Sequence, residues 1–301
     1  MTSAAVAGRT TFRVHDPRFE DALGADPRLE LVAEVDAHEG PVYVANEDAL
    51  YFTTVRRESV SIKRLALGDG SVSVVREQAN QANGMALDLE GRLVICEQGT
   101  FAEPARISRL DPRTGRYEIV ADAVDGLPLN SPNDVAVARD GSIWFTDPSY
   151  GYLQGFRPRP AVPDRVYRVH PPGRVEPAAG GFDKPNGLAL SPDERILYVA
   201  DNGAPHRLLA FDVGEDGRLS RRRRLAVGTP EHPDGLKVDS EGRIYASASA
   251  GIQVYAPDGA LLGEIRLPGA VNFTFGGRDR NVLFVTADTA VWAAELNAKG
   301  A

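Results

Sequence analysis

The sequence has one cysteine, no long apolar run and no basic region, and each absence excludes a class of protein. Cys96 is the only cysteine among 301 residues, so no disulfide can form within the chain. No stretch approaches the roughly 18 consecutive apolar residues of a membrane-spanning helix. The segment from Met1 to Arg13 lacks the cationic start and apolar core of a secretory signal. We therefore expect a cytoplasmic protein that does not insert into a membrane.

Positive charge is also scarce. The chain carries 34 Lys and Arg against 42 Asp and Glu, for a net charge of −8. An acidic chain without a basic domain is a poor partner for nucleic acid or an anionic membrane surface. The one basic run, residues 221–224, stands between short apolar stretches and is predicted to be a solvated strand or turn. We expect the partner of this protein to be a small molecule.

A unit of a short apolar strand, a turn and a second strand recurs six times. The clearest copy begins at Asn133, turns at Asp140 and Gly141, and ends its second strand at Asp147. The copies begin, in chain order, at Glu39, Asn83, Asn133, Asn186, Asp234 and Asn272. Their mean spacing of about 47 residues suits the four-stranded blade of a propeller. The sequence predicts one all-β domain over residues 1–301, folded as a six-bladed β-propeller.

The two ends of the chain are predicted to meet in the last blade. Residues 28–35 form a strand-like stretch that precedes the first repeat. We expect this stretch to close the ring by pairing with the hairpin of residues 282–286 and 290–296. Residues 1–15 are expected to be a flexible extension. A β-sandwich, the alternative all-β fold, would not require so regular a period.

The first residue of each copy is predicted to face the central channel, because the first strand of a propeller blade lies against the axis. Glu39 and Asp234 would supply two negative charges to this ring, and Asn133 and Asn186 would add amide oxygens. Water is the simpler occupant of such a ring. Carboxylate and amide oxygens without Cys or His are, however, the donors that hard divalent cations prefer. We expect one divalent ion, with Ca²⁺ favoured and Mg²⁺, Mn²⁺, Fe²⁺ or Zn²⁺ as alternatives.

Several long motifs occur in a fixed order, and together they are specific. They lie at residues 129–135, 144–151, 184–193, 233–239 and 272–279. In these motifs the chain resembles the family that joins senescence marker protein (regucalcin), the gluconolactonases and luciferin-regenerating enzyme, and most closely its bacterial gluconolactonase branch. The resemblance implies a six-bladed propeller with a divalent metal in its channel. It places the metal ligands on Glu39, Asn133, Asn186 and Asp234, the same four residues as the ring argument.

Lactone hydrolysis is the chemistry that the resemblance implies. A cation would polarise the lactone carbonyl and stabilise the oxyanion, and a nearby carboxylate would take a proton from water. Asp234 is predicted to be this general base, while Glu39 serves as a structural ligand. A serine triad is the obvious alternative for ester cleavage. The sequence contains no Gly-x-Ser-x-Gly motif, and its five histidines are scattered.

Six further residues are predicted to contact substrate, for different reasons. Asn83 and Asn272 complete the ring, and Tyr150 follows Asp147 in a loop long enough to cover the channel. Ser131 stands where regucalcins carry a sugar-contacting arginine, and His206 stands where gluconolactonases often have histidine. The predicted substrate-binding set is Asn83, Ser131, Asp147, Tyr150, His206 and Asn272.

Two other functions remain open from the sequence. Similar propellers hydrolyse organophosphates or aryl esters with the same kind of ring, and others bind calcium or a ligand without turnover. Fold alone does not favour catalysis. The preferred hypothesis is a metal-dependent lactonase for a sugar-acid or related small lactone, acting as a monomer or weak homodimer.

Overall fold

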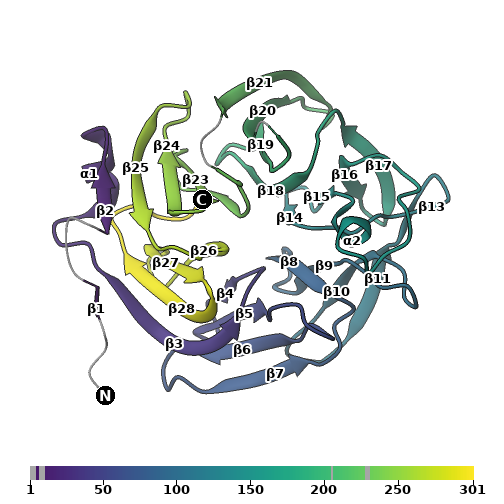
Figure 1. Ribbon diagram of the computed structural model, residues 1–301, viewed down its shortest axis with the longest axis horizontal. Coiled ribbons are helices and arrows are strands. Elements are labelled where there is room, and N and C mark those ends of the chain that lie inside the picture. The colour runs from purple at the N-terminus through teal and green to yellow at the C-terminus, as the bar shows by residue number, and fades with distance from the viewer. Residues whose placement is uncertain (1–4, 7–10, 205, 228–230) are drawn as a thin grey trace.

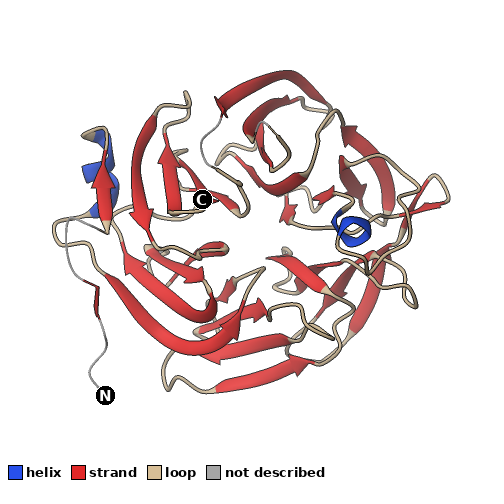
Figure 2. Cartoon of the chain, in the orientation of Figure 1, coloured by secondary structure: helices blue, strands red, loops and turns tan. Residues whose placement is uncertain are grey.

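Six antiparallel sheets of four or five strands stand around a central axis, as Figures 1 and 2 show. The structure is a computed structural model that describes residues 5–6, 11–204, 206–227 and 231–301. The first strand of each repeat lies nearest the axis, and the later strands of the same repeat lie progressively outward. The predicted six-bladed β-propeller is confirmed.

The blades follow one another in chain order. Blade 1 contains β4 (Val42–Val44), β5 (Ala49–Thr53), β6 (Ile62–Ala66) and β7 (Val72–Arg76). Blade 2 contains β8 (Ala82–Leu87), β9 (Leu93–Glu97), β10 (Arg106–Leu110) and β11 (Tyr117–Ala121). After a small hairpin of β12 (Ala123–Val124) and β13 (Leu127–Pro128), blade 3 contains β14 (Val135–Val137), β15 (Ile143–Asp147), β16 (Arg165–His170) and β17 (Arg174–Ala179). Helix α2 (Tyr150–Leu153) lies in the long connection between β15 and β16.

The second half of the ring repeats this plan. Blade 4 contains β18 (Pro185–Leu190), β19 (Ile196–Asp201), β20 (Arg207–Val213) and β21 (Leu219–Val227). Blade 5 contains β22 (Leu236–Val238), β23 (Ile244–Ala248), β24 (Gly251–Tyr255) and β25 (Leu261–Arg266). Blade 6 contains β26 (Asn272–Gly276), β27 (Val282–Thr286), β28 (Asp288–Glu295) and, from the start of the chain, β3 (Leu29–Ala37).

The chain closes the ring with its N-terminal strand, as predicted. Strand β3 pairs antiparallel with β28, with Ala37 opposite Asp288 and Leu29 opposite Ala294. The short strand β1 (Ala5–Val6) extends this sheet beyond β3. Residues far apart in sequence therefore hold the last blade together.

The flexible extension expected over residues 1–15 is wrong where strand β2 (Phe12–Val14) forms. Strand β2 pairs with β25 as a fifth strand of blade 5, with Phe12 opposite Ile265. Packing explains why this part of the chain is ordered. Helix α1 (Arg18–Leu23) follows β2 and buries Phe19 completely in the core between blades 5 and 6. Part of the expected extension, residues 1–4 and 7–10, lies outside the described residues.

Burial explains the strand patterns in the sequence. The second strand of a blade is covered on both faces by neighbouring blades, so it reads as a continuous apolar run. All five residues of β15 are buried, including Trp144 and Phe145. The outermost strands face solvent, and the basic run 221–224 lies exposed in β21. This confirms the prediction of a solvated strand for that run.

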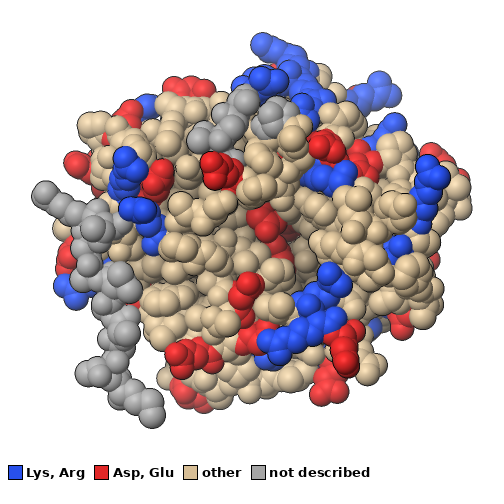
Figure 3. Space-filling view, viewed as in Figure 1, with Lys and Arg blue, Asp and Glu red and all other residues tan. Residues whose placement is uncertain are grey.

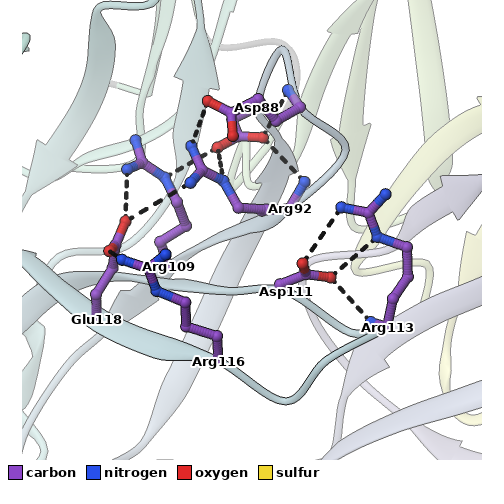
Figure 4. Close-up of polar contacts among 8 residues, drawn as sticks. Asp88, Arg92, Arg109, Asp111, Arg113, Arg116 and Glu118 are labelled. Atoms are coloured by element: carbon purple, nitrogen blue, oxygen red, sulfur yellow. Dashed lines mark hydrogen bonds and ion pairs between the residues drawn. The ribbon is translucent and has the colours of Figure 1, made fainter.

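Aspartates at the turns fix the ends of the strands in blade 2 (Figure 4). The Asp88 carboxylate accepts the backbone N–H of Arg92 at 2.9 Å and its side-chain Nε–H at 2.7 Å. Asp111 holds Arg113 in the same way at the next turn, with distances of 3.0 and 3.1 Å. Aspartate favours such positions because its short side chain hydrogen-bonds backbone two residues ahead. This charged network is structural and lies outside the channel.

No helix in the described part of the chain is both long enough and apolar enough to cross a membrane.

Candidate active site

The polar residues that begin the six repeats gather at one mouth of the channel. A cavity of about 190 Å³ opens there. Its lining includes five of the six repeat-start residues, namely Glu39, Asn83, Asn133, Asn186 and Asp234. Figure 3 shows acidic atoms in a hollow near the centre of this view of the molecule. The repeat position alone thus brings side chains from five blades to one small space.

Glycines after the repeat-start residues let neighbouring blades approach closely. The Gly84 N–H donates to the Asn133 carbonyl at 2.8 Å, and the Gly187 N–H donates to the Asp234 carbonyl at 3.0 Å. A Cβ atom at Gly187 would lie 2.2 Å from the Asp234 carbonyl oxygen, and one at Gly84 would lie 2.5 Å from the Asn133 oxygen. The Asn-Gly pairs in the sequence are therefore contact points between blades as well as parts of the ring.

Hydroxyl side chains on the second strands complete this backbone support. Thr53 Oγ1 donates to the Glu39 carbonyl at 3.0 Å, and Thr146 Oγ1 donates to the Asn186 carbonyl at 2.7 Å. Both threonines are fully buried. Because these bonds join a second strand to the start of an inner strand, the ring side chains are held by a rigid frame.

Glu39 is buried and held from two directions. Its Oε2 accepts the Gly40 N–H at 3.0 Å and the Asn272 Nδ2–H at 2.7 Å. The Asn272 Oδ1 in turn accepts the N–H of Phe273 at 2.8 Å. Asn272, the sixth repeat-start residue, therefore fixes the orientation of Glu39 and stands behind the cavity wall, where both ends of its amide are already used.

Both ring carboxylates are disfavoured as anions in the protein alone. Burial raises the pKa of Glu39 above its usual value, and the neighbouring Asp134 carboxylate raises it further. Burial also raises the pKa of Asp234 well above its usual value, and the Glu39 charge adds to this effect. The Asn186 side chain opposes it by hydrogen bonding to Asp234. A bound cation would reverse this cost by neutralising both charges.

Asn133 provides the second sign that the ring suits a cation. Its Oδ1 atom is buried and has no hydrogen-bond partner among the described residues. A buried amide oxygen without a partner is costly unless a water molecule or an ion satisfies it. No three His, Cys, Asp or Glu side chains converge as a metal cluster in the described chain. A cation here would therefore be held by two carboxylates together with amide oxygens, a donor set that suits Ca²⁺.

The predicted substrate-binding residues separate into two groups. Asn83 and Tyr150 line the cavity, and the Tyr150 hydroxyl accepts the Asn186 Nδ2–H at 3.4 Å. Burial raises the pKa of Tyr150, so its hydroxyl keeps its proton at neutral pH. Asn272 lies behind Glu39. His206 is not among the cavity-lining residues of the described chain, and its ring lies 4.4 Å from that of His232.

Ser131 and Asp147 support the loop that carries Tyr150 instead of lining the cavity. Ser131 Oγ donates to the Pro148 carbonyl at 2.6 Å and accepts the Gly151 N–H at 2.9 Å. The Asp147 carboxylate accepts the N–H groups of Asn130 and Ser131, both at 2.8 Å. Both side chains are completely buried. Their polar atoms are used in holding the loop.

Arg157 locks the same loop onto its neighbours. Its guanidinium donates to the carbonyls of Asn130 at 3.0 Å, Thr100 at 2.8 Å and Leu129 at 3.1 Å. Burial lowers the pKa of this side chain. The connection that includes α2 is thus a fixed wall of the cavity, preformed by contacts with blades 2 and 3.

Sequence reasoning missed several cavity-lining side chains. They come from connections in which no repeat position marks them: Thr54, Arg56, Gln98, Gln154 and Asn202. His38 also lines the cavity, and its place directly before Glu39 in the sequence indicates this position at the channel mouth. For Asn202 the sequence does contain a signal. Asn202 directly follows Asp201, which ends the second strand of its blade as Asp147 does in the preceding blade, and the connections that follow these aspartates lie at the cavity. The others lie in loops without periodicity.

Comparison with known proteins gives the family. The family model described as SMP-30/Gluconolactonase/LRE-like region matches residues 37–289. The chain belongs to this family, which confirms the resemblance drawn from its motifs.

Individual relatives agree with this assignment. The chain is 32% identical over 300 residues to a gluconolactonase from Zymomonas mobilis, covering 90% of this chain and 82% of that protein. It is 28% identical over 255 residues to the pentonolactonase XacC of Haloferax volcanii, covering 82% and 80%. A solved structure of a gluconolactonase from Xanthomonas campestris is similar with a TM-score of 0.86 at 34% identity, covering 98% of both chains.

Proposed function

We propose that this protein hydrolyses small lactones with the help of one divalent cation held by Glu39, Asn133, Asn186 and Asp234. The observation that carries the proposal is the meeting of two carboxylates and an unpartnered amide oxygen in one small cavity. Family membership supports the reaction, because relatives across most of the chain are named as a gluconolactonase and a pentonolactonase. A sugar-acid lactone or a related small lactone is the substrate class.

A bound cation would supply Lewis acidity at the lactone carbonyl and electrostatic stabilisation of the developing oxyanion. Ca²⁺ is the ion that the all-oxygen donors favour. Glu39 is suited to a holding role, because Gly40 and Asn272 already fix its carboxylate. Asp234 is partly exposed on the cavity wall, and the Asn186 side chain is its hydrogen-bond partner there, in place of the two donors that fix Glu39. It is therefore the carboxylate that can reach a water molecule.

The proposed reaction is a simple hydrolysis. Asp234 accepts a proton as the water oxygen bonds to the carbonyl carbon. The bond between that carbon and the ring oxygen then breaks, and the ring oxygen takes the proton as it becomes a hydroxyl. Asn83 and the protonated Tyr150 line the cavity where they can hydrogen-bond to hydroxyl groups of the substrate.

Acid release in weak buffer tests this proposal directly. The panel is glucono-1,5-lactone, a pentono-1,4-lactone, γ-butyrolactone, dihydrocoumarin and an aryl phosphoester, each with EDTA-treated protein and again after addition of Ca²⁺, Mn²⁺ or Zn²⁺. We expect turnover of at least one lactone that a cation restores. Turnover of the phosphoester alone would show that the protein is an organophosphate hydrolase and would overturn the proposed lactonase function.

The matched control for the panel is Arg278→Gln, which should behave as the wild type does, because Arg278 lines a separate cavity formed by the inner strands at the other end of the channel. Binding of a cation without turnover of any substrate would overturn the enzyme proposal in favour of a binding propeller. Full activity after EDTA treatment would overturn the cation.

A further inference from the structure

Arg56 brings a guanidinium group to the cavity that also contains the two ring carboxylates. It lies in the connection between β5 and β6 and lines the same cavity as Glu39 and Asp234. No carboxylate in the described chain forms an ion pair with it, although many other arginines of the protein do have such partners. A neutral lactone bound at the ring would leave this charge without a partner.

The guanidinium is held in place without being neutralised. Its Nη2–H donates to Gln154 Oε1 at 3.0 Å, and its Cζ atom lies 4.4 Å from the centre of the Phe156 ring. Both contacts come from the locked connection that follows α2. A planar guanidinium stacked on a ring keeps other N–H donors free, and two parallel donors match the two oxygens of a carboxylate.

The charges of the cavity favour one orientation of an anionic substrate. A divalent cation at the ring would already be balanced by the charges of Glu39 and Asp234, whereas Arg56 carries a positive charge that no carboxylate of the described chain balances and would attract a carboxylate of the substrate. The volume of about 190 Å³ suits one small ring with a short substituent. A lactone with a carboxylate on its side chain would therefore place its carbonyl at the ring and its carboxylate at Arg56.

We propose that Arg56 makes this protein select lactones that carry a second, free carboxylate, the class formed by ring closure of sugar diacids. This inference rests on the proposed lactonase function. Arg56 acts as a specificity-determining residue at the mouth of the cavity.

The test compares two substrates with the same ring, a neutral aldono-1,4-lactone and the corresponding aldaro-1,4-lactone. The quantity measured is the ratio of kcat/KM for the acidic lactone to that for the neutral one. We expect a ratio above one in the wild type, a drop of about 30-fold in Arg56→Gln, and partial recovery in Arg56→Lys, which keeps the charge but loses the planar fork. Higher ionic strength should lower the wild-type ratio.

Arg57→Gln is the matched control, because Arg57 is an exposed neighbour that does not line the described cavity. Its ratio should equal that of the wild type. A ratio in Arg56→Gln within threefold of the wild type, or an equal drop in Arg57→Gln, would overturn the inference and leave the lactonase function standing.

Failure to hydrolyse either lactone would instead count against the lactonase function. Equilibrium binding of the open-chain diacid glucarate, compared with glucitol, then decides the role of Arg56. Weaker binding of glucarate to Arg56→Gln than to the wild type, with Arg57→Gln unchanged, supports the role. Equal binding to all three proteins, or no binding to any of them, overturns it.

Discussion

The two ends of the central channel are built from the same six inner strands, yet they differ sharply in chemistry. One end is the small polar cavity around Glu39 and Asp234. The other is a wider cavity of about 740 Å³ with many apolar residues from the inner strands, such as Val135, Leu188 and Phe275. Its cationic lining residues include Lys237.

The difference follows from where each side chain stands on its strand. The ring residues that line the polar end stand before the inner strand or at its second position, and at Asn83 and Asn186 the strand pairing shifts its register. The other end is lined by the strands themselves, whose residues pack between blades. Asp134 lies between the two ends, is almost fully buried, and its Oδ2 is 3.8 Å from Lys237 Nζ. The carboxylates of Glu39 and Asp234 thus lie together at the end where the repeats begin, apart from the Asp134 and Lys237 pair.

Asp234→Asn should have the largest effect, because it should abolish most of the activity at the polar end of the channel. We expect kcat/KM for the best lactone to fall by about 10³-fold, because the variant cannot accept the proton from water. Arg278→Gln, at the other end, should retain wild-type kinetics. Full activity in an Asp234→Asn protein that still binds the cation would overturn the assignment of the base.

Removal of the cation should destabilise the protein through the polar end alone. Free Ca²⁺ at 100 times its Kd should raise the free energy of unfolding by about 2.7 kcal/mol. Differential scanning calorimetry with EDTA or Ca²⁺ measures this shift. Glu39→Gln should reduce the response strongly, whereas Arg278→Gln should keep it. An equal response in Glu39→Gln would place the cation elsewhere.

Gly187→Ala should strain the contact between blades 4 and 5 beneath the ring. The added Cβ would lie 2.2 Å from the Asp234 carbonyl oxygen, so the backbone must shift. We expect a loss of about 2 kcal/mol in urea unfolding. Gly68→Ala, where nothing lies within 4 Å, is the matched control and should be close to neutral. Equal stability of the two variants would contradict the close contact.

Asp147, which holds the loop that carries Tyr150, should make the free energy of unfolding depend on pH. Burial raises its pKa from 3.8 to about 7. Between these values the folded state keeps a proton that the unfolded chain releases, so this group lowers stability as the pH rises from about 4 to 7. The slope is at most about 1.4 kcal/mol per pH unit. Above pH 7 the loss is constant.

Asp147→Asn removes this titration, because an amide does not ionise. The stability of the variant relative to the wild type should therefore rise across the same pH range. Urea unfolding at several pH values measures this difference, and parallel curves for the two proteins would contradict the prediction.

The fold and the ring could be predicted because both follow from repetition. A period of about 47 residues defines the blade, and one position in each repeat must then face the axis. The positions of Ser131 and Asp147 could not be predicted in the same way. A polar residue in a connection can point into the channel or into its own loop, and here the loop needs their hydrogen bonds.

Arg56 shows a second limit of sequence reasoning. It stands in an exposed connection beside Arg57 and Glu58, with no periodic pattern to separate it from its neighbours. Its partner Gln154 lies 98 residues away and belongs to another blade. Only the packing of the connection after α2 against blade 2 brings the two together.

The closure of the ring by β3 also determines when the last blade can fold during synthesis of the chain. A ribosome makes β3 about 250 residues before β28, its pairing partner, which at roughly 5–20 residues per second is a wait of about 10–50 s. Until then the two-residue strand β1 is the only partner that β3 has in its sheet among the described residues, and Glu39, two residues beyond β3, lacks the Asn272 amide that orients it. The first residue of the ring is made early and is set in place nearly last.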